Sequence, residues 1–342
     1  MLKGIIGRKW LWAVTAILAI FLIVPLLAPR YYVYVLAVIL VTALLAMSLN
    51  LTIGYGGLFQ FHHGVFYGVG AYTVALVLTK TSMPKWVGFA AGPIAAALVG
   101  LLIGWFCIRL SQLYFGMLQI SLGSLIWAIV YRWYDFTGGD DGIYGIPTPS
   151  ILRSQNNSYY FILLVATICI IVMYVIVRSP FGATLQAIRD NPQRCAAVGI
   201  NVRRHQLMAI VIATLFAGVA GVLFVTLERY VHPHLLFWVL SLEIFIMCLL
   251  GGWFTFAGPM LGAAIIVSLR TGVILTALIS FLPDGEMATA LRGFLRVYTE
   301  YWTLILGIVL ILLIFFLPEG VMGFFQDRLR PRAAQGTEKD SG

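Results

Sequence analysis

Charged residues are scarce in this sequence, and acids are fewer than bases. Only 10% of the 342 residues are Asp, Glu, Lys or Arg, whereas 61% are hydrophobic. Soluble domains usually carry about 25% charged residues. Because so few polar groups cannot cover the surface of a soluble protein, the composition predicts a polytopic membrane protein. The net charge of +9 does not indicate nucleic acid, since the basic residues lie mostly between apolar runs.

Cysteine is also rare, and its spacing argues against two kinds of site. The four cysteines are scattered and form no C-x-x-C pair: Cys107, Cys169, Cys195 and Cys248. This pattern suggests neither a metal site nor a disulfide framework. His62 and His63 are adjacent, so on a helix their side chains diverge and do not easily share a metal. We therefore expect no metal site.

Motifs for common enzymatic chemistry are missing. The chain has no G-x-x-x-x-G-K-[ST], no G-x-S-x-G and no H-E-x-x-H. It also has no cluster of acids within its apolar runs that would suit hydrolysis or a proton relay. A polytopic membrane enzyme would need a convergent set of ionisable groups, so we expect no catalytic residue on this chain.

Long apolar runs are abundant and predict an all-α polytopic membrane protein. One crossing needs about 20 apolar residues, so the sequence has room for about ten transmembrane helices. We expect one transmembrane domain over residues 1–327 and a polar tail over 328–342. The run 10–28 is too long for the core of a signal peptide and is assigned as the first span. The predicted spans are 10–28, 31–50, 63–79, 86–108, 113–134, 159–177, 207–228, 237–250, 259–281 and 300–317.

The longest polar interruption, residues 178–206, carries five arginines and a single acid, Asp190. Cationic loops between spans stay in the cytoplasm, which with ten spans places both termini there as well. Ser179 as N-cap and Pro180 at the first helical position predict a short helix that ends at Asn191-Pro192. A second helical turn is expected to stop at Gly199.

Two Gly-rich stretches interrupt the apolar pattern at membrane depth, one from Gly54 to Gly70 and the other from Gly251 to Pro259. Irregular backbone is tolerated there only when protein or water covers it. Paired interruptions in the two halves of a transporter point to the translocation path. The alternative interpretation is close helix packing at small residues. The candidate path residues are Asn50, Gly54, Gly57, Gln60, His63, Gly252 and Thr255.

Two charged residues lie within predicted spans. Glu243 falls in 237–250 and Arg270 falls in 259–281. A bare charge at the bilayer centre costs at least ~2.5–3.5 kcal/mol, so such residues usually pair. Because the two spans are consecutive and antiparallel, we expect Glu243 and Arg270 to pair. The sequence leaves open whether this pair lines the path, where we include it, or only braces the bundle.

The loop 135–158 is predicted to lie outside the cell membrane. It contains a run of Gly and Asp that predicts a tight, structured turn: Thr137, Gly138, Gly139, Asp141 and Gly142.

Four stretches in order resemble one family, the permease subunits of ABC importers for branched-chain amino acids. The first joins Leu49-Asn50-Leu51 to Gly54, Tyr55, Gly57 and His63, and then to a glycine-rich run ending at Tyr72. The second is the Gly and Asp turn of loop 135–158. The third joins Ser179-Pro180-Phe181-Gly182, Ala187-Ile188-Arg189-Asp190-Asn191 and Gly199-Ile200-Asn201-Val202, and the fourth joins Gly251-Gly252, Thr255, Gly258-Pro259 and Gly262-Ala263.

The resemblance implies that this chain forms the path of an ATP-driven importer in the bacterial inner (cytoplasmic) membrane. Its implied partners are a homologous permease subunit, two ATP-binding cassette ATPase subunits and an extracytoplasmic substrate-binding protein. No cofactor is implied for this chain, since ATP and Mg would bind the ATPases.

The resemblance also assigns two docking regions. Residues Thr137, Gly138, Gly139, Asp141 and Gly142 would meet the binding protein. Loop 178–206 would dock on the ATPases, with Phe181, Arg189 and Asp190 as the main contacts. The full set of coupling candidates is Ser179, Pro180, Phe181, Gly182, Ala187, Arg189, Asp190, Asn191 and Gly199.

The chain departs from the family pattern at His62, Gln60 and Phe254, where smaller residues are usual. Larger groups near the path could alter what passes, so branched-chain amino acids, urea, short amides and aromatic acids all stay open as substrates. A passive channel or secondary transporter for a small solute such as urea or an amide also accounts for the spans and the Gly-rich stretches. It does not account for the arginine-rich loop.

Overall fold

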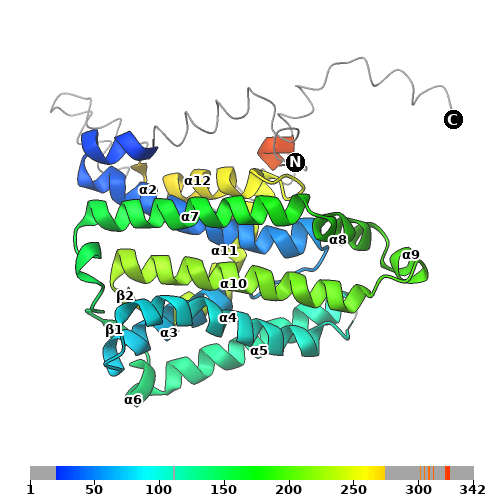
Figure 1. Ribbon diagram of the computed structural model, residues 1–342, viewed down its shortest axis with the longest axis horizontal. Coiled ribbons are helices and arrows are strands. Elements are labelled where there is room, and N and C mark those ends of the chain that lie inside the picture. The colour runs from blue at the N-terminus through cyan, green and yellow to red at the C-terminus, as the bar shows by residue number, and fades with distance from the viewer. Residues whose placement is uncertain are drawn as a thin grey trace.

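The described part of the chain is a bundle of long apolar helices (Figure 1). The computed structural model describes residues 21–110 and 112–273, together with residues 301, 304, 307, 308, 311 and 320–323. The helices are α2 (Arg30–Asn50), α3 (Gly64–Lys80), α4 (Lys85–Cys107), α5 (Gln112–Arg132), α6 (Tyr134–Thr137), α7 (Gln155–Arg178), α8 (Pro180–Asp190), α9 (Pro192–Ala197), α10 (Val202–Glu228), α11 (Trp238–Gly251) and α12 (Gly258–Arg270). A π-helical turn, Leu51–Tyr55, continues α2, and short 3-10 turns form at Ser150–Leu152 and Pro233–Leu236.

Five of these helices are long and apolar enough to cross a membrane: Arg30–Tyr55, Lys85–Cys107, Leu113–Arg132, Gln155–Arg178 and Val202–Glu228. The three shorter apolar helices, α3, α11 and α12, have 17, 14 and 13 residues and border the two Gly-rich stretches. The helical class is confirmed. The count of ten spans stays a prediction, since most of 300–317 and most of 10–28 lie outside the residues that the structure describes.

Helix α10 lies at the centre of the bundle and packs against α3, α4, α2 and α7. Small residues let these helices approach closely, as they commonly do in membranes. A Cβ added at Gly70 would lie 2.7 Å from Gly218 Cα, and one added at Gly218 would lie 2.6 Å from Ala96 Cβ. Part of the glycine content is therefore explained by helix packing, which was the alternative interpretation of the sequence.

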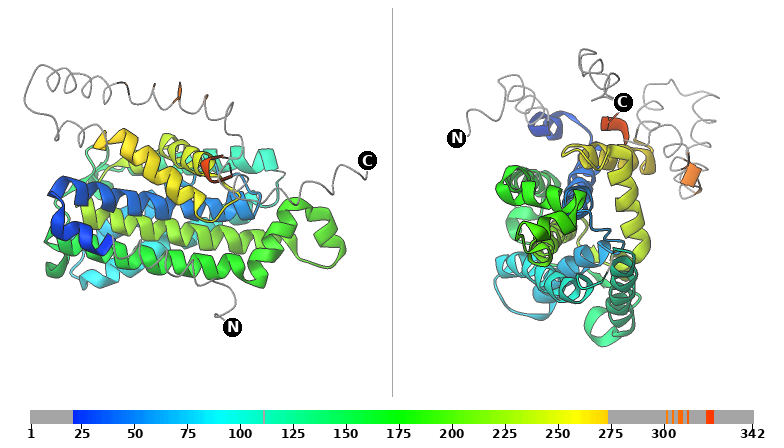
Figure 2. Two further views of the ribbon diagram at one scale, coloured as in Figure 1. Left: turned by 90° about the horizontal axis from the view of Figure 1, so that it is seen from above. Right: turned by 90° about the vertical axis from the view of Figure 1, so that its right-hand side faces the viewer.

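The two ends of the bundle are built differently (Figures 1 and 2). At one end α8 and α9 project beyond the long helices. At the other end lie α6 and a two-stranded antiparallel sheet, β1 (Ile143–Tyr144) with β2 (Tyr230–Val231), which the sequence did not predict. The predicted coupling loop and the predicted binding-protein loop thus lie at opposite ends of the molecule.

Candidate functional site

The first break, residues 51–63, leads from α2 through the π-helical turn into α3. It encloses a chain of buried polar side chains. Gln60 Oε1 lies 3.1 Å from Thr52 Oγ1 and 2.8 Å from His63 Nδ1. On its other side, His63 Nε2 lies 2.8 Å from Ser48 Oγ. All four side chains are fully buried, so the hydrogen bonds between these side chains replace hydrogen bonds to water.

The second break, residues 252–257, joins α11 to α12. Gly252 starts it with a φ of 103°, which favours glycine. Thr255 then organises the turn: its hydroxyl donates to Gly252 O at 2.8 Å and accepts from Gly258 N at 3.1 Å. The Thr255 side chain thereby satisfies the first backbone N–H of α12, whose N-cap residue is Ala257.

The two breaks lie side by side although about two hundred residues separate them. Asn50 Nδ2 donates to Thr255 O at 3.2 Å. The backbone of the second break comes so close that a Cβ at Gly54 would overlap Trp253 O. The structure thus brings the two predicted interruptions together in one place. Four of the candidate path residues lie there: Asn50, Gly54, Gly252 and Thr255.

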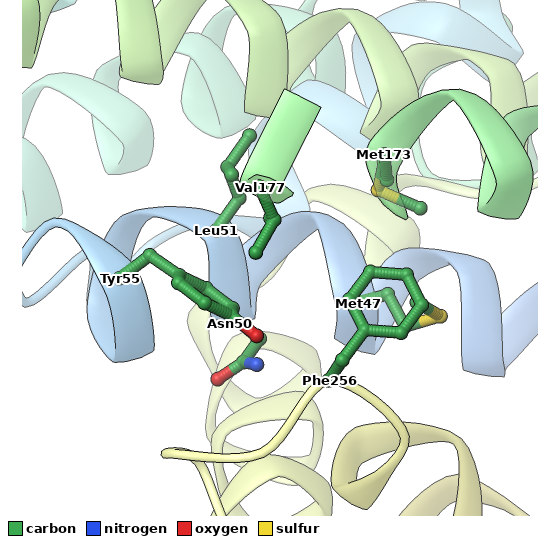
Figure 3. A pocket seen from close by; sticks show the side chains of 7 residues that line it. All are labelled: Met47, Asn50, Leu51, Tyr55, Met173, Val177 and Phe256. Atoms are coloured by element: carbon green, nitrogen blue, oxygen red, sulfur yellow. The ribbon is translucent and has the colours of Figure 1, made fainter. Parts of the chain in front are cut away.

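A cavity of about 10 Å³ lies beside this junction (Figure 3). It is lined by Met47, Asn50, Leu51, Tyr55, Met173, Val177 and Phe256. A volume near 10 Å³ holds about one water molecule, so the breaks are packed together here rather than arranged around an open passage. Asn50 Oδ1 and Gln60 Nε2 have no hydrogen-bond partner within the described ranges, and both are buried. An unpaired buried polar atom is costly, which makes these two atoms candidates for contact with a solute.

Arg189 attaches α8 to both breaks. Its Nη1 donates to Gly54 O at 2.7 Å, and its guanidinium carbon lies 5.1 Å from the centre of the Phe254 ring. The same side chain pairs with Asp190 at 3.0 Å. The sequence predicted that Arg189 contacts a partner ATPase. In the structure its side chain contacts Gly54, Phe254 and Asp190 of its own chain.

The other coupling candidates divide into an outer and an inner face of α8. Pro180, Ala187 and Asp190 are exposed, as is Gly199 beyond α9. Ser179, Asn191 and Phe181 are half-buried, with the Phe181 ring 6.0 Å from that of His205. Gly182 is buried because α8 turns back onto α7, where a Cβ would overlap Val177 O. The outer face is the part of the predicted set that a partner can reach.

Glu243 and Arg270 form the predicted ion pair, with 3.2 Å between Oε2 and Nη1. Glu243 is 18% exposed and Arg270 is 56% exposed. Glu243 lies eight residues before Gly251, the end of α11, so roughly 12 Å of helix separates the pair from the second break. The structure thus confirms the pair but sets it apart from the other candidate path residues.

The predicted outer turn is structured. Thr137 Oγ1 lies 2.6 Å from Val130 O and 2.7 Å from Trp133 O, so its single O–H is shared between them or donated to one, and Gly138 follows in a left-handed conformation. Asp141 is exposed and accepts a hydrogen bond of 2.9 Å from the Tyr134 hydroxyl. This bond to a carboxylate raises the pKa of Tyr134. Gly139 and Gly142 also adopt positive φ, which explains the glycines of this turn.

His62 and His63 point to different partners: His62 contacts the backbone carbonyls of Ile120 and Leu236, whereas His63 contacts Ser48 and Gln60. Within residues 21–110 and 112–273, no three His, Cys, Asp or Glu side chains gather into a possible metal site. Sequence reasoning missed Ser48 and Thr52 as members of the buried polar chain. Their signal was a run of polar residues, Ser48, Asn50 and Thr52, at every second position of an otherwise apolar span.

A family model described as the permease component of a branched-chain amino acid transport system matches residues 31–314. The chain belongs to this family. It is a multi-pass membrane protein of a family of transport components, not of enzymes. No solved structure matches the chain.

Curated relatives include permease proteins of branched-chain amino acid transport and one of autoinducer 2 import. The chain is 25% identical to the high-affinity branched-chain amino acid transport system permease protein LivM of Escherichia coli. The match covers 72% of this chain and 64% of LivM. It is 24% identical to the permease protein LivH of Salmonella typhimurium, over 66% of this chain and 79% of LivH. It is also 24% identical to the autoinducer 2 import system permease protein LsrC of Klebsiella pneumoniae, over 86% of this chain and 87% of LsrC.

Proposed function

We propose that this chain is a permease subunit of an ATP-driven importer for branched-chain amino acids or a related small polar solute. The path would form with a second permease subunit and would receive solute from an extracytoplasmic binding protein. The family description, a permease component of a transport system, supports transport as the activity, and the import system of the relative LsrC supports its direction. Two permease proteins, LivM and LivH, carry the name of the same system in Escherichia coli, which supports a paired subunit here.

The observation that carries the proposal is the position of α8. This short helix projects beyond the bundle (Figure 1) and at the same time contacts both breaks through Arg189. Its outer face carries small exposed residues, Pro180, Ala183 and Ala187, and Val198 beside α9 is 78% exposed. Small apolar groups on a projecting helix suit the groove of a partner protein. We assign that groove to the ATPase subunits, with ATP and Mg bound there.

In this proposal, closure of the two ATPases on ATP displaces α8, and the bundle switches between two packings with outward and inward access. Asn50 and Gln60 would supply polar contacts to the solute as the breaks separate. The turn containing Thr137 to Gly142, at the opposite end, would receive the binding protein. Both termini and loop 178–206 would lie in the cytoplasm.

Co-purification of the tagged chain from its native membrane tests the proposal. We expect ATPase subunits and a second permease to accompany it, and a loaded binding protein to raise ATP hydrolysis. Ala187→Trp should reduce recovery of the ATPases by about tenfold, because the bulky ring would fill the docking face. Asp140→Trp, at the opposite end of the bundle, is the matched control. A chain that purifies alone and conducts solute in liposomes without ATP would instead be a passive channel.

A further inference from the structure

Arg189 points inward from a helix whose next residue points outward. Its side chain is 26% exposed, whereas that of Asp190 is 67% exposed. Leu185 and Ile188, which are fully buried, fix the orientation of α8 against the bundle. The position of the Arg189 guanidinium is therefore set by the packing of α8.

The atom that Arg189 reaches lies at the end of a helix. Gly54 is in the π-helical turn Leu51–Tyr55 that ends α2, and Leu58 N, one turn later, bonds to Thr52 O instead. Carbonyls in the last turn of a helix have no partner within the helix, and cations are favourable there. Arg189 Nη1, at 2.7 Å from Gly54 O, supplies the missing donor.

The other nitrogens of the guanidinium also donate hydrogen bonds, and the group contacts an aromatic ring. Nε and Nη2 both donate to Asp190 Oδ1 at 3.0 Å. The guanidinium carbon lies 5.1 Å from the centre of the Phe254 ring in the second break, a distance at which cations are attracted to aromatic faces. Gly57 leaves space for the Arg189 stem, because a Cβ there would lie 2.8 Å from Arg189 Cγ.

We propose that Arg189 is a positioning residue that caps the broken end of α2 and holds the second break against it. We call these combined contacts the Arg189 cap. A displacement of α8 removes the donor from Gly54 O and the cation from Phe254 in one step. The order of both breaks thus depends on where α8 stands. Only the consequence for transport rests on the proposed function; the cap itself is a property of this chain.

Hydrogen exchange of the permease in lipid nanodiscs, followed by mass spectrometry, tests the cap without any partner. In Arg189→Ala we expect backbone amides of residues 51–58 and 252–258 to exchange on the order of tenfold faster, since a charge-assisted bond is lost. Arg189→Lys keeps a cation within reach of Gly54 O and should restore part of the protection. Arg203→Ala is the matched control, because Arg203 is an exposed arginine of the same loop without a side-chain hydrogen bond in the described ranges.

Faster exchange in both breaks, with unchanged exchange in α3 and α10, supports the cap. Exchange that stays within twofold of the parent protein in both breaks overturns it, as does an equal increase in Arg203→Ala. The same variants are then measured in the assembled importer. There we expect Arg189→Ala to lower the stimulation of ATP hydrolysis by loaded binding protein, and Arg189→Lys to recover part of it. If no ATPase binds the parent chain, the proposed function fails while the exchange result still decides the cap.

Discussion

At the scale of single residues, His62 shows how a departure from the family pattern is accommodated. The ring is fully buried, with Nε2 2.8 Å from Leu236 O and Nδ1 3.2 Å from Ile120 O. Carbonyl oxygens only accept hydrogen bonds, so an imidazole N–H is the donor, and the shorter contact is the one from Nε2 to Leu236 O. Gly123 provides the space, because a Cβ there would overlap His62 Nδ1. The histidine ties the first break to α5 and to the turn before α11.

Replacement of His62 should therefore destabilise the bundle. We expect His62→Ala to lower the free energy of unfolding by about 2–4 kcal/mol, because it removes a buried hydrogen bond and leaves a void. His62→Gln keeps an N–H donor and should cost less. Thermal unfolding in detergent, followed by tryptophan fluorescence, measures both. His234→Ala, at an exposed histidine, is the control, and a His62→Ala midpoint equal to that of the control would contradict this role.

At the scale of helices, the contact of α10 with α4 depends on the absence of a side chain at Gly218. A methyl group added there would lie 2.6 Å from Ala96 Cβ and 2.8 Å from Pro93 Cα. Overpacking of this kind costs about 1–3 kcal/mol. We expect Gly218→Ala to lower the unfolding temperature.

Gly88→Ala in α4 is the matched control, because its nearest neighbour is Val77 Cγ1 at an ordinary 3.4 Å. Alanine favours a helix over glycine by about 1 kcal/mol, so this control should be neutral or stabilising. The unfolding midpoint of Gly218→Ala should thus fall below that of Gly88→Ala. A shift of the same sign and size in both would show that helix packing at Gly218 is not tight.

The ends of α8 could be predicted from the sequence, whereas its inner contacts could not. Ser179, Pro180 and Asn191-Pro192 act locally, and the structure has α8 over Pro180–Asp190 as predicted. The bond from Arg189 to Gly54 spans 135 residues and depends on the π-helical turn, which leaves a carbonyl without a donor. No local sequence pattern predicts that turn. The sequence therefore predicted only a bond from Arg189 to a carboxylate of a partner.

At the scale of the whole molecule, the apolar runs located the five long helices together with α3 and α11 to within about five residues. The predicted span 259–281 was too long, because α12 ends at Arg270. Hydropathy works here because the bilayer demands long apolar segments. It could not show that the two breaks meet, since their contacts join Asn50 to Thr255 across the fold. The sequence left open whether the pair of Glu243 and Arg270 lines the path or braces the bundle, and in the structure roughly 12 Å of helix separates this pair from the second break.

The orientation of the molecule can be tested by thiol labelling. We expect Val198→Cys to react with a membrane-impermeant maleimide only from the cytoplasmic side and Asp140→Cys only from the outer side. Both positions are exposed, and all four native cysteines are buried, so the parent chain is a low-background control. Labelling of intact spheroplasts and of inside-out vesicles separates the two sides. The reverse pattern would invert the topology and remove α8 from the cytoplasm.

The pairing of β1 with β2 has a mechanical consequence. It fastens the α5–α7 connection to the α10–α11 connection through backbone bonds, with Ile143 opposite Val231 and Tyr144 opposite Tyr230. At the other end, within the described residues, Arg189 provides the one side-chain hydrogen bond between α8 and the breaks. Backbone pairing thus ties two connections together at the sheet end, whereas a single side-chain bond does so at the α8 end. We therefore expect the α8 end of the bundle to be displaced more readily than the sheet end.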